Sequence, residues 1–315
     1  MDFISIIIQA VLLIVGFVLL IKGSDFFVDG ASNVASILKI PTLIVGLTIV
    51  AFGTSAPEAA VSITSSLSGS NALALSNVIG SNLFNMLLII GLCALLNELK
   101  VGKEVLNLDL PFLVFLTGIL TVFILLGWNI SRVEGIILLV LIIAYVSYLV
   151  YNARKSKESQ VVEKPKMSLL KSIIYIVCGV AAIIIGADLV VDSASYIAMA
   201  FGMSETLVGL TIVAIGTSLP ELATSLTALK KDENQLIIGN VIGSNIFNIS
   251  LVLGASSAIS PIAINPNMLV DIVLMLGVTI LFFIFGKTQD KYDKKEGFIL
   301  VALFIVYMAF AILRN

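Results

Sequence analysis

Long apolar runs alternate with short polar stretches along the whole chain. A helix needs about 20 apolar residues to cross the hydrocarbon core of a bilayer, and ten runs approach or exceed that length. The runs cover residues 4–32, 41–66, 72–97, 107–127, 132–153, 167–197, 205–229, 235–258, 267–286 and 296–313. The pattern therefore predicts an all-α polytopic membrane protein with ten transmembrane helices.

Basic residues between the spans predict the orientation. If the N-terminus lies outside, the loops after the odd-numbered spans are cytoplasmic and contain 16 of the 18 Lys and Arg residues, all except Arg132 and Arg314. Cytoplasmic loops carry an excess of Lys and Arg, so we predict that both termini lie outside. No basic residue precedes the first apolar run, which we therefore expect to remain as a helix rather than to act as a signal peptide.

The second half of the chain repeats the first. Residues 45–58 recur at 208–221 with 12 of 14 positions identical, and residues 77–85 recur at 240–248 with 8 of 9 identical. Both pairs share an offset of 163 residues. We predict a first five-helix repeat at 1–153, a cytoplasmic linker at 154–166 and a second repeat at 167–315. Because five is odd, the two repeats are inverted, as in many secondary transporters that bind their substrate near the midplane.

The repeated segments contain polar residues inside apolar runs. An ionised carboxylate within the membrane costs on the order of 2.5 kcal/mol or more, so Glu58 and Glu221 are functional-site candidates. Pro57 and Pro220 lack a backbone donor and predict a kink in each helix. Backbone carbonyls released by such a kink must be satisfied by protein or by a cavity, and a bound cation satisfies them. The hydroxyl of Thr54 lies four residues before Glu58, on the same helix face.

The second repeated motif supplies further oxygen atoms. Asn77, Ser81 and Asn85 follow one another at four-residue spacing and form one polar stripe on a helix. The counterparts of this stripe are Asn240, Ser244 and Asn248. Carboxylate, hydroxyl, amide and carbonyl oxygens suit hard cations such as calcium and sodium. Pro, Ser, Thr or Asn alone in a membrane helix is usually structural, but their duplicated combination with Glu favours a functional site.

Four acidic residues at the ends of spans fit a different role. Asp25 and Asp29 are repeated as Asp188 and Asp192, late in the first and sixth spans, where the chain leaves the membrane. We interpret these four residues as solvated or capping groups.

Composition narrows the class of protein. The chain is 59% hydrophobic and 12% charged, with a mean hydropathy of +1.13, which exceeds what a soluble fold can bury. The near-neutral balance of 18 basic and 20 acidic residues argues against a nucleic-acid partner. No histidine is present, and we interpret Cys93 and Cys178 as isolated packing residues. No nucleophile–base pair or nucleotide motif is found, so we expect neither an enzyme nor a cofactor, and no obligate protein partner is evident.

The two motifs carry a family resemblance. GTSAPE and GTSLPE, each followed by GSNxFN, resemble the alpha-repeats of sodium/calcium exchangers of the calcium/cation antiporter superfamily, most closely the prokaryotic calcium/sodium antiporters. The resemblance implies that helices one and six slide across a core of helices two, three, seven and eight, in a prokaryotic cell membrane. It implies calcium ligands at Glu58 and Glu221 and at the backbone carbonyls of Thr54 and Thr217. It further implies flanking sodium sites that involve Ala51, Thr54, Ser55, Glu58, Ser81, Asn85, Ala214, Thr217, Ser218, Glu221, Ser244 and Asn248.

Position 248 separates the subfamilies. Potassium-dependent members and some prokaryotic relatives have Asp where this chain has Asn248, which makes potassium transport less favoured. Proton/calcium exchangers carry a GNATE-like motif instead of GTSxPE and are a weaker match. The predicted function is sodium/calcium antiport by alternating access, and the resemblance implies three sodium ions per calcium. A potassium-dependent or proton-coupled calcium antiporter, or a sodium-coupled symporter for an organic solute, is the alternative.

Overall fold

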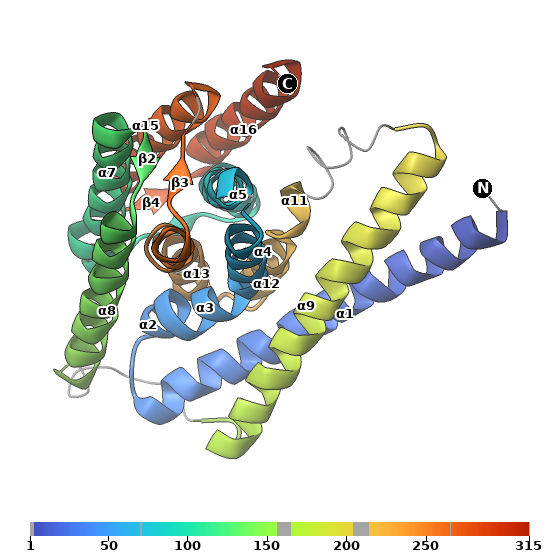
Figure 1. Cartoon of the computed structure of the whole chain (residues 1–315). Helices are drawn as coiled ribbons and strands as arrows, with labels where there is room; N and C mark the ends of the chain where they lie inside the picture. Colours follow the sequence, from blue (N-terminus) through green and yellow to red (C-terminus); the bar gives the residue numbers. More distant parts are fainter. Residues whose placement is uncertain (1–2, 70, 156–164, 204–213, 265, 315) are drawn as a thin grey trace.

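A computed structural model describes residues 3–69, 71–155, 165–203, 214–264 and 266–314, which are almost entirely helical (Figure 1). The first half contains α1 (Phe3–Leu38), α2 (Thr42–Val45), η1 (Gly46–Val50), α3 (Ala51–Thr54), α4 (Ala56–Leu67), α5 (Asn71–Leu83), η2 (Phe84–Ile89), α6 (Ile90–Leu96), β1 (Leu99–Lys100), η3 (Val105–Asp109), α7 (Leu110–Gly127), β2 (Asn129–Ile130) and α8 (Arg132–Lys155). The second half contains α9 (Leu169–Ala200), α11 (Ala214–Gly216), α12 (Leu219–Lys230), α13 (Asn234–Phe247), η6 (Asn248–Leu253), α14 (Gly254–Ile259), β3 (Ile262–Ala263), α15 (Pro266–Gln289), β4 (Lys291–Tyr292) and α16 (Lys294–Arg314). Segments labelled η are π-helices.

The described residues confirm a multi-pass membrane protein. Eight of their helices are long and apolar enough to cross a membrane, and the bent segment that runs from Thr42 to Leu67 makes a ninth. The span predicted at 205–229 lies partly outside the described residues, because the description resumes at Ala214. The count of ten and the inverted arrangement therefore stay predictions.

Two spans form the centre of the molecule. The apolar windows of Asn71–Leu96 and Asn234–Ile259 are 78% and 94% buried, whereas those of the other six unbent spans are 11–39% buried. Figure 1 shows α5 and α13 nearly end-on, with the other helices around them. Polar side chains on these two spans therefore face protein, while the outer helices present apolar side chains to lipid.

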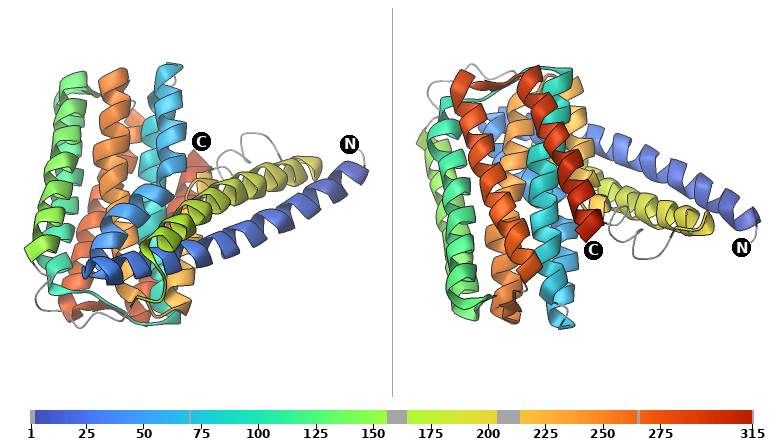
Figure 2. Two further views of the ribbon diagram at one scale, coloured as in Figure 1. Left: turned by 90° about the horizontal axis from the view of Figure 1, so that it is seen from below. Right: turned by 90° about the horizontal axis from the view of Figure 1, so that it is seen from above.

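The helices α1 and α9 form a separate arm. They lie side by side and extend beyond the bundle toward the N-terminal end of α1 (Figures 1 and 2). Glycines allow this close approach, since a Cβ atom at Gly23 would lie 2.9 Å from the carbonyl oxygen of Gly179. A Cβ atom at Gly186 would lie 2.8 Å from the carbonyl oxygen of Gly16. Small residues at such positions let membrane helices pack backbone to backbone.

Two short antiparallel ladders connect the halves, a feature that the hydrophobic pattern does not predict. In one ladder, β1 pairs with β4, with Leu99 opposite Tyr292. In the other, β2 pairs with β3, with Ile130 opposite Ile262. Each ladder joins a loop of the first half to a loop of the second half and so helps to hold the two halves together.

The second span breaks close to its proline, as predicted. The break lies at Ser55, where φ is −80° and ψ is 7°, and the two parts of the span meet at a bend of 48°. Pro57 is in the first turn of α4, where a missing backbone donor is tolerated. In the second half, Ser218 has a similar conformation and Pro220 is in the first turn of α12. The break therefore falls two residues before each proline.

The cysteine prediction is half correct. Cys93 is buried in α6, as expected of a packing residue. Cys178 is exposed on α9, so the packing interpretation is wrong for this residue. The hydrophobic pattern could not distinguish the two, because a lipid-facing position and a core position are equally apolar in a membrane helix.

Candidate functional site

Both intramembrane glutamates lie at the centre of the protein, immediately after the helix breaks. Glu58 is in the first turn of α4, Glu221 is in the first turn of α12, and each has 0% exposed surface. Figure 1 shows α4 and α12 next to each other, between the central helices and the arm. The structure thus brings together the two acids that the repeat singled out.

Each glutamate accepts a hydrogen bond from the opposite half. The hydroxyl of Ser55 donates to Oε1 of Glu221 at 3.0 Å, and the hydroxyl of Ser218 donates to Oε1 of Glu58 at 3.3 Å. These serines occupy the two helix breaks, so the same local conformation that bends the span points its hydroxyl across the interface between the halves. The two bonds are counterparts under the offset of 163 residues.

Serines on the central helices complete the same pattern within each half. Ser81 on α5 donates to Oε1 of Glu58 at 3.4 Å, and Ser244 on α13 donates to Oε1 of Glu221 at 3.4 Å. Each Oε1 atom therefore accepts two hydroxyl donors, one from each half of the chain. This arrangement holds the carboxylate groups in a defined orientation.

The threonines also reach across the interface. Thr54 donates through its hydroxyl to Oδ1 of Asn240 at 3.1 Å, and Thr217 donates to Oδ1 of Asn77 at 3.3 Å. The amide of Asn240 in turn donates to Ser225. The two asparagine stripes predicted from the sequence thus anchor the helix breaks of the opposite halves.

Asparagines that the sequence reasoning missed link the central helices. Asn85 donates to Oδ1 of Asn245 at 3.1 Å, and Asn248 donates to Oδ1 of Asn82 at 3.1 Å. Asn82 and Asn245 are 1% and 0% exposed. The prediction counted one stripe at four-residue spacing and excluded these two residues, although both are part of the repeated Gly-Ser-Asn motif. That duplication is the signal that could have identified them.

Four buried oxygen atoms in this network have no hydrogen-bond donor. They are Oε2 of Glu58, Oε2 of Glu221, Oδ1 of Asn85 and Oδ1 of Asn248. Buried polar atoms are almost always satisfied, and each unsatisfied one costs about 1–3 kcal/mol or more. All four are acceptors, so cations satisfy them better than any donor-poor environment. Carboxylate and amide oxygens are ligands for sodium and calcium.

The backbone positions implied by the resemblance are less distinctive. The carbonyl of Ala51 accepts from the amide of Ser55 at 3.0 Å and from the hydroxyl of Thr54 at 3.4 Å. Ala214 is the first residue of α11 and borders the undescribed stretch 204–213. The roles of these carbonyls as ion ligands stay predictions.

The four aspartates lie away from the glutamates, at the ends of the arm helices. Lys231 bridges α1 to the loop after α12, since its Nζ lies 2.7 Å from Oδ1 of Asp29 and 3.6 Å from Oδ1 of Asp25. Asp188 and Asp192 are exposed on α9. This placement agrees with the interpretation of solvated groups and adds an ion pair in the first half.

Comparison with known proteins identifies the family. The model described as "Sodium/calcium exchanger protein" matches residues 8–151 and 171–313. The chain belongs to this family. It is 37% identical to inner membrane protein YrbG of Escherichia coli over 95% of each chain. It is 30% identical to sodium/calcium exchanger MaX1 of Methanosarcina acetivorans, over 94% of this chain and 96% of that one.

A solved structure gives the same result. The sodium-calcium exchanger NCX_Mj, soaked with 10 mM Na⁺ and 10 mM Sr²⁺, matches with a TM-score of 0.86 and 31% identity over 96% of this chain and 98% of that chain. The sodium/calcium exchanger fold and its relatives are those of transporters, so the protein is a cation/calcium antiporter and not an enzyme.

Proposed function

We propose that the protein exchanges sodium for calcium by alternating access through the site around Glu58 and Glu221. The observation that carries this proposal is the set of four buried acceptor oxygens without donors, two of them from carboxylates. Such a set attracts cations and has no complementary feature for an anion or for the apolar body of an organic solute. Nothing therefore favours a sodium-coupled solute symporter.

In this proposal the glutamates hold calcium together with the backbone carbonyls of Thr54 and Thr217. Sodium ions occupy flanking positions formed by Ser55, Ser81 and Asn85 in one half and by their counterparts in the other. The reciprocal hydrogen bonds support the assignment, because residues related by the repeat face one another across a common centre. Opposed, inverted repeats are the arrangement that lets such a site open to either side in turn.

Charge balance explains how the two ions compete. Two carboxylates are neutralised by one calcium ion or by two or more sodium ions, and an unneutralised pair is costly to move through a low-dielectric region. Three sodium ions per calcium would move one net charge per cycle, which couples exchange to the membrane potential by about 2.3 kcal/mol per 100 mV. We propose this electrogenic stoichiometry, with both termini outside the cell membrane.

A flux experiment tests the proposal. The purified protein is reconstituted into proteoliposomes loaded with sodium, and uptake of calcium-45 is measured after dilution into sodium-free medium. Uptake is expected with an outward sodium gradient, to cease when the ionophore monensin dissipates that gradient, and to be absent in the double variant Glu58→Gln/Glu221→Gln. Calcium uptake that does not depend on the sodium gradient would refute sodium/calcium exchange.

A further inference from the structure

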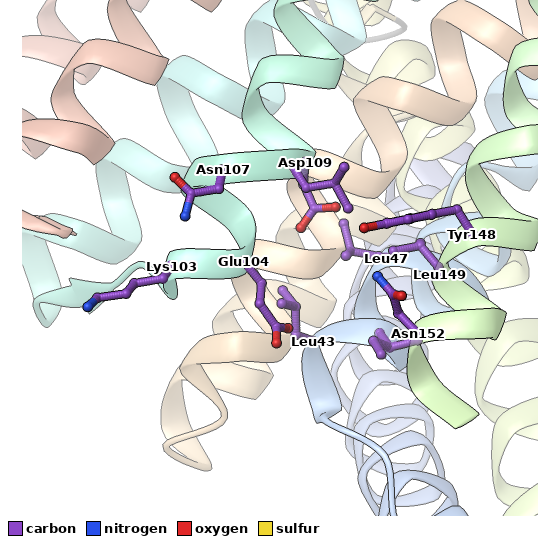
Figure 3. Close-up of a pocket in the computed structure, with 11 residues that line it drawn as sticks. Leu43, Leu47, Lys103, Glu104, Asn107, Asp109, Tyr148, Leu149 and Asn152 are labelled. Atoms are coloured by element: carbon purple, nitrogen blue, oxygen red, sulfur yellow. The ribbon is translucent and has the colours of Figure 1, made fainter. Parts of the chain in front are cut away.

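A second polar cavity lies away from the glutamates, among α2, η1, η3 and α8 (Figure 3). Its volume is about 360 Å³. The apolar side of the cavity consists of the buried side chains of Leu43, Leu47 and Leu149. Its polar side is formed by Lys103, Glu104, Asn107, Asp109, Tyr148 and Asn152. No part of the proposed sodium and calcium site contributes to this lining.

Asp109 is the buried acid of this cavity. It is only 1% exposed, and Oδ1 accepts a hydrogen bond of 2.7 Å from the hydroxyl of Tyr145. No Lys or Arg among the described residues forms an ion pair with it. In Figure 3 the carboxylate points into the cavity, whereas the side chain of Lys103 extends away from it. A buried carboxylate without a cationic partner is unusual in folded proteins.

The second half of the chain shows what the matching position holds. The left-handed residues that end α7 and α15, Trp128 and Asp290, are related by an offset of 162 residues. The same offset relates the capping box of α8, Ser131 with Glu134, to that of α16, in which Asp293 and Glu296 bond each other's backbone amides. The motifs around the glutamates have an offset of 163, so the first half contains one additional residue before Trp128.

That additional residue coincides with a π-helix. η3 covers Val105–Asp109, whereas the corresponding start of α15 is an ordinary α-helix. A π-helical turn accommodates one extra residue, and such bulges are frequent at functional sites. Beyond the bulge, the offset of 162 therefore makes Asp109 the counterpart of Asp271.

The same offset matches Tyr145 to Tyr307 and Asn152 to Arg314. In the second half, Arg314 donates two hydrogen bonds to Asp271, at 3.0 and 2.8 Å. In the first half, Asn152 replaces the arginine and lines the cavity beside Asp109. One half thus supplies its own guanidinium group to the carboxylate, and the other half leaves space at the equivalent position.

We propose that this cavity binds a small organic cation through a guanidinium or primary ammonium group held by Asp109. The volume lies at the lower end of the range of small-molecule pockets and is too large for a bare metal ion. The cation would bond to the carboxylate as Arg314 does in the other half, and the amide oxygens of Asn107 and Asn152 can accept its remaining N–H donors. The leucine side chains suit its hydrocarbon part. The cation is either a free solute or the ethanolamine headgroup of a phospholipid.

The test uses phenylguanidinium as the probe and the full-length protein in nanodiscs of phosphatidylcholine and phosphatidylglycerol. Titration is followed by calorimetry and by the melting temperature, neither of which depends on transport. The wild-type protein should bind the probe saturably. Asp109→Asn should weaken binding about tenfold or more, because a charge-assisted pair is lost. Asp271→Asn, the matched change in the second half, should leave the affinity unchanged.

A further variant keeps the test decisive if Asp109→Asn fails to fold. Asn152→Arg reproduces the arrangement of the second half, so it should abolish probe binding while the protein stays folded. Absence of saturable binding to the wild type, or equal binding to Asn152→Arg, would overturn the proposal. Nanodiscs that contain phosphatidylethanolamine identify the source of the cation: a lower apparent affinity for the probe indicates the lipid headgroup, and an unchanged affinity indicates a free solute.

Discussion

Replacing Glu58 by glutamine separates the charge of the site from its shape. Oε1 of Glu58 accepts hydrogen bonds from Ser218 and Ser81, whereas Oε2 has no partner. The glutamine will therefore keep its carbonyl oxygen at the Oε1 position and place its NH₂ group at the Oε2 position. That group is a donor with partial positive charge and faces the proposed ion position, so it repels a cation.

The magnitude follows from the burial of the group. Truncating one partner of a buried, hydrogen-bonded charge pair costs about 2–5 kcal/mol of binding free energy. At 1.4 kcal/mol per factor of ten, Glu58→Gln should weaken calcium binding by roughly 30-fold to 3,000-fold. Folding without calcium should not suffer, because the change removes a buried carboxylate oxygen that has no donor.

Thermal unfolding with and without calcium measures both effects. A ligand that binds the folded state raises the melting temperature in proportion to its affinity and concentration. The wild type should show a calcium-dependent rise, and Glu58→Gln should show none at the same calcium concentration while its calcium-free melting temperature is unchanged or higher. The matched control is Glu98→Gln, because Glu98 is 51% exposed in an ion pair with Lys291. If Glu58→Gln kept the calcium-dependent rise, the assignment of Glu58 as a calcium ligand would be wrong.

Three other predictions follow from the network and from the arm. Asn82→Ala removes the acceptor of the Asn248 amide, so it should lower the sodium-gradient-driven calcium flux severalfold, and an unchanged flux would exclude a role for this link in the site. Lys231→Ser removes the ion pair of α1 with Asp29, which is partly exposed and therefore worth about 1 kcal/mol or less; cysteine labelling of the arm should increase up to about fivefold, and no increase would show that the pair does not restrain α1. Because position 248 is an amide without charge, exchange at zero membrane potential should need no potassium, whereas a potential imposed with valinomycin should change the flux; an absolute requirement for potassium would contradict this prediction.

Several features could be predicted from the sequence because their cause is local. The number of apolar residues in a run determines whether a helix can cross the membrane, so the described spans lie within a few residues of their predicted bounds, apart from α1, which extends to Leu38. A proline inside such a run must disturb the helix whatever surrounds it. Glu58 and Glu221 could be selected because a carboxylate in an apolar span is costly at any position along the chain.

Other features exist only once the two halves are packed together. The exchange of hydrogen bonds between Ser55 and Glu221 depends on where α4 and α12 meet, which no pattern within either span records. Asn82 lies off the stripe of Asn77, yet it is buried because the central helices contact protein on nearly all sides. Asp109 looks like an ordinary residue near the start of a span, and only the π-helix before it and the loss of an arginine counterpart give it a cavity. Local composition thus determines the spans and the candidate acids, whereas the partner of each polar atom is determined by contacts between residues more than a hundred positions apart.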